Sequence, residues 1–178
     1  IAIAVCIALM IVGLYWQGRV WWCKVGDWSP WSSDIWTAHN SQHLFDPYTF
    51  THILHGVLFF WIVDFFFKEI PLRWKIFLVI LAEAIWEFAE NSNAVIERYR
   101  AVTISLDYYG DSILNSLADV ASCAFGAFLA YKLKFWRSFA YFVLTEIILL
   151  FWVRDNLTLN VIMLIYPIEA IKIWQAGI

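Results

Sequence analysis

Three acidic side chains are spaced for shared chemistry inside an otherwise apolar segment. Glu83, Glu87 and Glu90 recur every three or four residues in the string LAEAIWEFAEN. At about 100° per residue in a helix they fall within an arc of about 60°, so they face one direction. An ionisable side chain near the centre of a bilayer costs roughly 2.5–3.5 kcal/mol, and acids on one stripe of a spanning helix therefore indicate a functional site.

Two histidines could add ligand atoms to these acids. His52 and His55 lie three residues apart and share one helix face. Imidazole together with carboxylate suits zinc, manganese or iron. We predict a divalent metal site with four ligands: His52, His55, Glu87 and Asp111. The chain contains no H-E-x-x-H motif, Gly-rich phosphate loop or G-x-S-x-G elbow, so nucleotide hydrolysis and serine acyl transfer have no support.

The composition indicates that these residues lie in a membrane. The chain is 62% hydrophobic and only 15% charged, whereas about a quarter of the residues of a typical soluble protein are charged. A bilayer core of about 30 Å requires roughly 20 residues of helix. We predict an all-α polytopic bundle that forms one membrane domain over residues 1–178. Its six spans are 1–16, 48–67, 74–91, 111–131, 135–153 and 157–174.

The last span is the weakest of the six. Thr158 and Asn160 lie early in it, and Pro167 removes a backbone donor and bends it, so it could be a half-helix. Two long connections, residues 17–47 and 92–110, join the spans on one side. The chain starts at Ile1 within an apolar run, and we expect further residues before it.

Lysine and arginine indicate which side faces the cytoplasm. Seven of them lie on the side of the short connections: Lys68, Arg73, Lys75, Lys132, Lys134, Arg137 and Lys172. Five lie on the other side, among acidic residues: Arg19, Lys24, Arg98, Arg100 and Arg154. We therefore predict that both termini and the short connections are cytoplasmic and that the long connections lie outside.

This topology brings polar residues of several spans into the outer half of the bundle. Asp111, Asn115, Asp119 and Ser122 fall within about 80° on their helix and can meet the glutamates and histidines. Like charges this close must hold protons or face a cation, so we predict a metal centre, a proton relay or an acid–base pair. The alternatives are structural pairing of the acids with Arg98 and Arg100, and a polar seam that joins the helices.

Two classes of function follow. In the first, an enzyme at the outer leaflet uses a metal-bound water to attack an ester or phosphoester of a lipid or lipid-linked substrate. Its predicted catalytic residues are Glu83, Glu87, Asp111 and Asp119. Its predicted substrate-binding residues are Arg98, Arg100, Asn91 and Asn115; the arginine forks suit phosphate oxygens, although they could equally pair with Glu97 or Asp107.

In the second class the chain is a non-catalytic membrane subunit or binding protein of a larger complex, and the polar cluster is a packing seam. A transporter has less support because no internal repeat is visible. We expect membrane lipids as partners in either class, and no nucleic acid.

The three cysteines add little to these hypotheses. Cys6 and Cys123 lie in predicted spans as small apolar side chains, and Cys23 has no obvious partner in the outer connection. A disulfide framework is not implied.

Four strings resemble one family. They are NSQHLFDPYTFTHILHG (40–56), EAIWEFAENS (83–92), ERYRAVTISLDYYGDSILNSLADV (97–120) and VRDNLTLNVIMLIYP (153–167). They are similar to an uncharacterised family of bacterial integral membrane proteins, domain of unknown function 2585 or uncharacterised protein family 0314. The resemblance covers nearly the whole chain and implies a multi-pass protein of the bacterial inner membrane, without a particular reaction.

The chain departs from this family at one position. The family pattern has a second cysteine two residues after Cys23, where this chain has Val25. The departure counts against a metal or disulfide role for that pair here. A looser similarity links the pattern GDS-x2-NS-x2-D (residues 110–119) to VanZ-like membrane proteins, which is a fold-level analogy and implies no chemistry.

Overall fold

The computed structural model describes residues 1–103 and 107–177. Residues 104–106, in the predicted connection 92–110, and residue 178 lie outside this description. Within the described residues there are seven helices: α1 (Ala2–Trp16), α2 (Thr49–Phe66), α3 (Leu72–Glu90), α4 (Asn93–Val102), α5 (Ile113–Trp152), α6 (Leu157–Ile165) and α7 (Glu169–Ala176). The part of the chain described here has no strand beyond one isolated bridge between Trp31 and Phe45, so the all-α prediction is confirmed.

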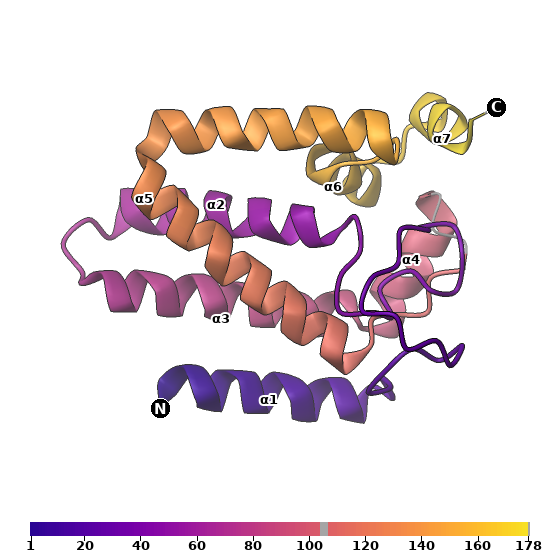
Figure 1. Cartoon of the computed structure of the whole chain (residues 1–178), viewed down its shortest axis with the longest axis horizontal. Coiled ribbons are helices and arrows are strands. Elements are labelled where there is room, and N and C mark those ends of the chain that lie inside the picture. Colours follow the sequence, from indigo (N-terminus) through magenta and orange to yellow (C-terminus); the bar gives the residue numbers. More distant parts are fainter. Residues whose placement is uncertain (104–106, 178) are drawn as a thin grey trace.

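The long helices form a bundle along the long axis of the molecule. Figure 1 shows α1, α2, α3 and the second half of α5 running along this axis, with the first half of α5 crossing the bundle obliquely. The loop of residues 17–48 lies with α4, α6 and α7 at the end opposite the N-terminus (Figure 1). The bundle and this end region are therefore distinct parts of the molecule.

Helix α5 is two helices joined at Lys134. This residue has φ 64° and ψ 173°, a backbone conformation almost confined to glycine. The helix folds back on itself there (Figure 1), so its two halves correspond to the separate predicted spans 111–131 and 135–153.

Two helices have the length and composition needed to cross a membrane. They are α2, with 18 residues, and α5, with 40 residues across its break. Helix α1 is apolar but has 15 residues, and α3 has 19 residues and carries the three glutamates.

The predicted sixth span is not one helix. It is divided into α6, with nine residues, and α7, with eight, and Pro167 lies between them, where its missing N–H cannot continue a helix. Nine residues rise about 14 Å, roughly half a bilayer core. Helix α7 lies at the end opposite the N-terminus (Figure 1), so the prediction that both termini lie on one side is not confirmed.

The predicted connection 92–110 contains a helix that sequence analysis missed. Helix α4 begins after Ser92, whose hydroxyl accepts a hydrogen bond from the Val95 N–H. Its buried residues Ile96, Tyr99 and Val102 recur every three residues, a spacing typical of a short amphipathic helix.

Glycines set the spacing of α2 and α5, the most extensive helix contact in the bundle. A Cβ atom on Gly56 would overlap the Cys123 carbonyl, and one on Gly126 would overlap the Ile53 carbonyl. Small residues let two backbones approach this closely. The contact fixes α2, and with it the histidines near its N-terminal end.

Candidate functional site

Two histidines of α2 converge on one carboxylate of α3. The Nδ1 atom of His52 lies 2.6 Å from Glu83 Oε1, and Nδ1 of His55 lies 3.1 Å from Oε2. All three residues are buried, and Glu83 is 0% exposed. Because a carboxylate only accepts hydrogen bonds, both Nδ1 atoms carry the proton. Glu83 thus fixes the tautomer and the orientation of both rings.

Glu87 lies beside this pair with no hydrogen-bond partner among the described residues. Both of its carboxylate oxygens are buried, and Oε1 is 3.4 Å from His52 Nδ1. The Oε2 atom of Glu90, one turn further along α3, is also buried without a hydrogen-bond partner among the described residues. His52, Glu87 and Glu90 each offer a ligand atom, and these atoms lie within 4.8 Å of one another. Buried carboxylates in such a group need a proton or a cation.

Helix α5 supplies a further carboxylate and an amide. Asp119 Oδ2 is 3.8 Å from His52 Nε2, so His52 lies between acids of α3 and α5. The side-chain oxygen and nitrogen of Asn115 are buried without a partner in the described chain. The three predicted polar stripes therefore do meet around His52.

Asp111 lies apart from this group. Its carboxylate accepts hydrogen bonds from Asn91 Nδ2 at 2.7 Å and from the Tyr108 hydroxyl at 3.0 Å. Burial raises its pKa, and the hydrogen bonds from these two partners act in the opposite direction. Asp111 does not belong to the groups of converging ligand atoms found among the described residues, which contain Glu83 and Glu90 instead. Asn91 holds Asp111 rather than facing the pocket directly.

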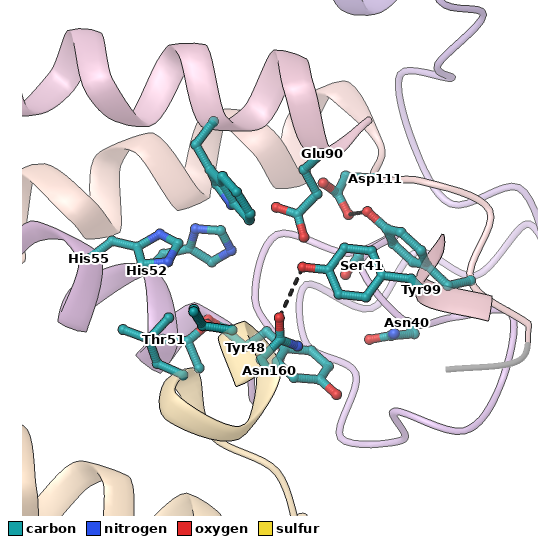
Figure 2. A pocket seen from close by; sticks show the side chains of 14 residues that line it. Asn40, Ser41, Tyr48, Thr51, His52, His55, Glu90, Tyr99, Asp111 and Asn160 are labelled. Carbon is teal, nitrogen blue, oxygen red and sulfur yellow. Dashed lines mark hydrogen bonds between the residues drawn. The ribbon is translucent and has the colours of Figure 1, made fainter. Parts of the chain in front are cut away.

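A pocket opens beside the histidines. Its empty space is about 570 Å³, including the open solvent at its mouth. Figure 2 shows His52 and His55 at one side, with Glu90 and Asp111 facing the cavity from another. The Tyr99 hydroxyl donates to Asn160 Oδ1 at 3.0 Å. The pocket thus joins the buried ligand group to polar side chains of α4 and α6.

Sequence analysis missed Tyr99, Tyr108 and Asn160 as pocket residues. Asn160 had a visible signal, because it is a polar residue early in an apolar segment. The two tyrosines had none, since residues 92–110 were interpreted as a connection.

The two arginines predicted to bind substrate do not line this pocket. Arg98 is directed to the Leu164 carbonyl, to which its Nε donates at 3.1 Å. The Arg100 guanidinium lies 4.3 Å from the centre of the Tyr109 ring. Arg100 instead lines a second pocket together with Arg19 and Lys24, and Asp111 lines both pockets.

Glu146 of α5 serves a structural purpose away from the ligand group. Its carboxylate oxygens accept hydrogen bonds from the backbone N–H groups of Leu157 at 2.9 Å and Thr158 at 3.0 Å. These are the first residues of α6, so Glu146 stabilises the N-terminus of that helix.

The sequence was compared with known proteins. A family model described as "Protein of unknown function (DUF2585)" matches residues 14–177. The chain is 45% identical over 172 residues to a UPF0314 protein of Brucella anthropi, covering 97% of this chain and 87% of that protein. It is 42% identical over 175 residues to one of Paracoccus denitrificans, covering 97% and 89%. It is 44% identical over 176 residues to one of Rhizobium johnstonii, covering 97% and 90%. No solved structure matches the chain.

Proposed function

We propose that this chain, which belongs to the DUF2585 family, is a multi-pass protein of the bacterial inner membrane that hydrolyses a lipid or lipid-linked substrate. The bond cleaved is an ester or phosphoester. A divalent metal ion is held by His52, Glu87 and Glu90 at the inner side of the pocket. The observation that carries the proposal is Glu87, a fully buried carboxylate whose oxygens have no hydrogen-bond partner among the described residues.

Charge supports the proposed orientation. The two short connections of the bundle carry Lys68, Arg73, Lys132, Lys134 and Arg137, and short basic connections are retained in the cytoplasm. Lys172, which sequence analysis assigned to the same side, belongs to α7 at the opposite end. In this orientation the pocket opens toward the periplasm, beside the outer leaflet.

The chemistry of the donor set supports a metal ion. One imidazole with two carboxylates suits zinc, manganese or iron, and such an ion supplies a bound water of lowered pKa. Glu83 orients His52 through its short hydrogen bond, in the way that outer partners orient metal-binding histidines. Asp119, beside His52 Nε2, can take up a proton released in the cluster.

Polar groups around the pocket support an anionic substrate. Tyr99 and Asn160 present hydrogen-bonding groups to the cavity. On the other side of Asp111, the second pocket gathers Arg19, Lys24 and Arg100. These cations are suited to the phosphate of a head group, with the ester portion in the first pocket.

The test is the metal content of the detergent-purified protein. We expect the variant Glu87→Gln, Glu90→Gln to lose one equivalent of bound metal, together with hydrolysis of lipid esters or phosphoesters. The control Glu69→Gln changes an exposed glutamate in the α2–α3 turn and should keep both the bound metal and the hydrolytic activity. A folded double variant that retains all of its metal would overturn the proposal.

A second candidate is a non-catalytic subunit of a larger membrane complex. It is favoured by the hydrogen bonds from His52 and His55 to Glu83, which join α2 to α3. In that case removing Glu83 lowers stability, the double variant leaves the metal content unchanged, and a partner protein co-purifies with the chain.

A further inference from the structure

A second group of ligand atoms lies in the loop of residues 17–48, outside the helical bundle. Cys23 Sγ is 3.5 Å from His39 Nδ1, which is 3.1 Å from His43 Nε2. The three ligand atoms lie within 4.8 Å of one another. Sequence analysis predicted no partner for Cys23, and this was wrong. The spacing of His39 and His43, with three residues between them, is a signal that could have found the group.

The tautomer of His43 is fixed for metal binding. Its Nδ1–H donates to the Ser29 carbonyl, because a carbonyl oxygen only accepts. The lone pair of Nε2 therefore points toward His39 and Cys23. A backbone carbonyl on the far nitrogen is the usual outer partner of a metal-binding histidine. His43 is 0% exposed, so this arrangement is well protected from water.

The distances agree with ligands on one tetrahedral zinc ion. With Zn–N of about 2.05 Å and Zn–S of about 2.3 Å, two nitrogens lie roughly 3.3 Å apart and sulfur and nitrogen roughly 3.6 Å apart. The observed separations are 3.1 Å between the nitrogens and 3.5 Å between sulfur and nitrogen.

Asp27 is suited to be the fourth ligand. Its Oδ2 is 4.0 Å from His43 Nε2, while Oδ1 accepts a hydrogen bond from the Ser29 N–H at 2.9 Å. The side chain of Asp27 is 49% exposed, so it can move the short distance needed to complete a tetrahedron.

We propose that Cys23, His39, His43 and Asp27 form a structural zinc site. Zinc here closes a long loop that contains no helix or strand, and a metal that closes such a loop stabilises the folded chain. The turn between the two histidines contains Asn40 and Ser41, which line the pocket described above. The zinc therefore fixes one wall of that pocket from outside the bundle.

Cobalt(II) titration of the intact, metal-stripped protein in detergent tests the site. A cysteine thiolate bound to cobalt gives a sulfur-to-cobalt charge-transfer band, which the sulfur-free group at Glu87 cannot give. We expect this band to be complete within two equivalents of cobalt, one for each proposed metal group, and to disappear on addition of zinc. Its absence in the wild-type protein overturns the proposal without any variant.

Two cysteine variants identify the ligand. Cys23→Ser should abolish the band and weaken zinc binding by more than the roughly 10–100-fold typical of losing an outer partner. The control Cys6→Ser changes a half-buried cysteine of α1 and should keep the band. A folded Cys23→Ser protein with the wild-type spectrum contradicts the assignment.

Discussion

The molecule contains two histidine clusters that differ in the group that accepts the imidazole Nδ1–H. In the bundle, Nδ1 of His52 and of His55 both donate to Glu83, and both oxygens of Glu87 and Oε2 of Glu90 have no hydrogen-bond partner in the described chain. In the loop, His43 donates its Nδ1–H to a backbone carbonyl and turns its free nitrogen toward His39 and Cys23. In both clusters the acceptor of Nδ1–H leaves Nε2 as the nitrogen available to a metal ion, but that acceptor is a buried carboxylate in the bundle and a neutral backbone carbonyl in the loop.

The clusters also differ in what positions them. The bundle cluster depends on the packing of α2 against α3 and α5, whereas the loop cluster is held by backbone and side-chain hydrogen bonds within residues 22–43. Perturbing helix packing should therefore affect the first cluster before the second.

The largest effect is expected from Gly126→Val. The added side chain must displace the Ile53 carbonyl of α2, and we expect the free energy of unfolding to fall by on the order of 3 kcal/mol or more. Thermal unfolding in detergent measures it. Ala121→Val adds two methyl groups at an exposed position of the same helix and should change little. Equal destabilisation by both variants would contradict a special role for the glycine contact.

A smaller loss is expected from Glu83→Gln. The amide keeps the shape of the side chain but leaves two buried imidazoles without their shared carboxylate, a change that costs on the order of 3 kcal/mol. Unfolding by denaturant measures the loss, with Glu69→Gln as the control. The cobalt band of the loop should persist in the folded variant. If the band disappears with Glu83, the two clusters are not independent.

The smallest effect is a pH dependence at Asp46, which links the two regions. Its carboxylate accepts hydrogen bonds from the N–H groups of Ser41, at 3.1 Å, and of Tyr48, at 2.8 Å. Burial raises its pKa from 3.8 to about 6. The folded state thus holds the proton more tightly, and stability falls as the pH rises from about 4 to about 6, by at most about 3 kcal/mol.

The variant Asp46→Asn cannot ionise, so its stability should depend less on pH across this interval. Part of the dependence should remain, because burial also raises the pKa of Asp155 to about 6. Asp34→Asn removes an exposed acid with a similar local hydrogen bond, to the Trp36 N–H, and should keep the wild-type dependence. Denaturation series at several pH values measure how the free energy of unfolding changes with pH. An Asp46→Asn variant with the same pH dependence as the wild-type protein would contradict the assignment.

Helices and their polar stripes could be predicted from the sequence because both follow from local periodicity. Apolar segments of about 20 residues predicted α2, α3 and the two halves of α5. The rotation of about 100° per residue predicted that His52 and Glu83 lie on polar stripes that face each other. Helix α4 was missed because it is short and amphipathic, and the division of the last segment was seen only as a weakness at Pro167.

The composition of each cluster could not be predicted, because it depends on contacts between distant residues. Nothing local distinguishes Asp111, which Asn91 and Tyr108 hold in place, from Glu90, which joins the ligand group. The partnership of Cys23 with His39 and His43 depends on how an irregular loop folds, and hydropathy carries no information about such a path.

The capping of α6 by Glu146 has a consequence for the order in which the chain assembles. The Glu146 carboxylate accepts hydrogen bonds from N–H groups that lie only 11 and 12 residues later in the chain. The turn between α5 and α6 can therefore form soon after those residues are synthesised. Cys123 lies 67 residues after Gly56, so their contact forms only after that longer segment has been synthesised. The corner between α5 and α6 can thus form from contacts that are local in sequence, whereas the α2–α5 contact joins segments that are synthesised far apart in time.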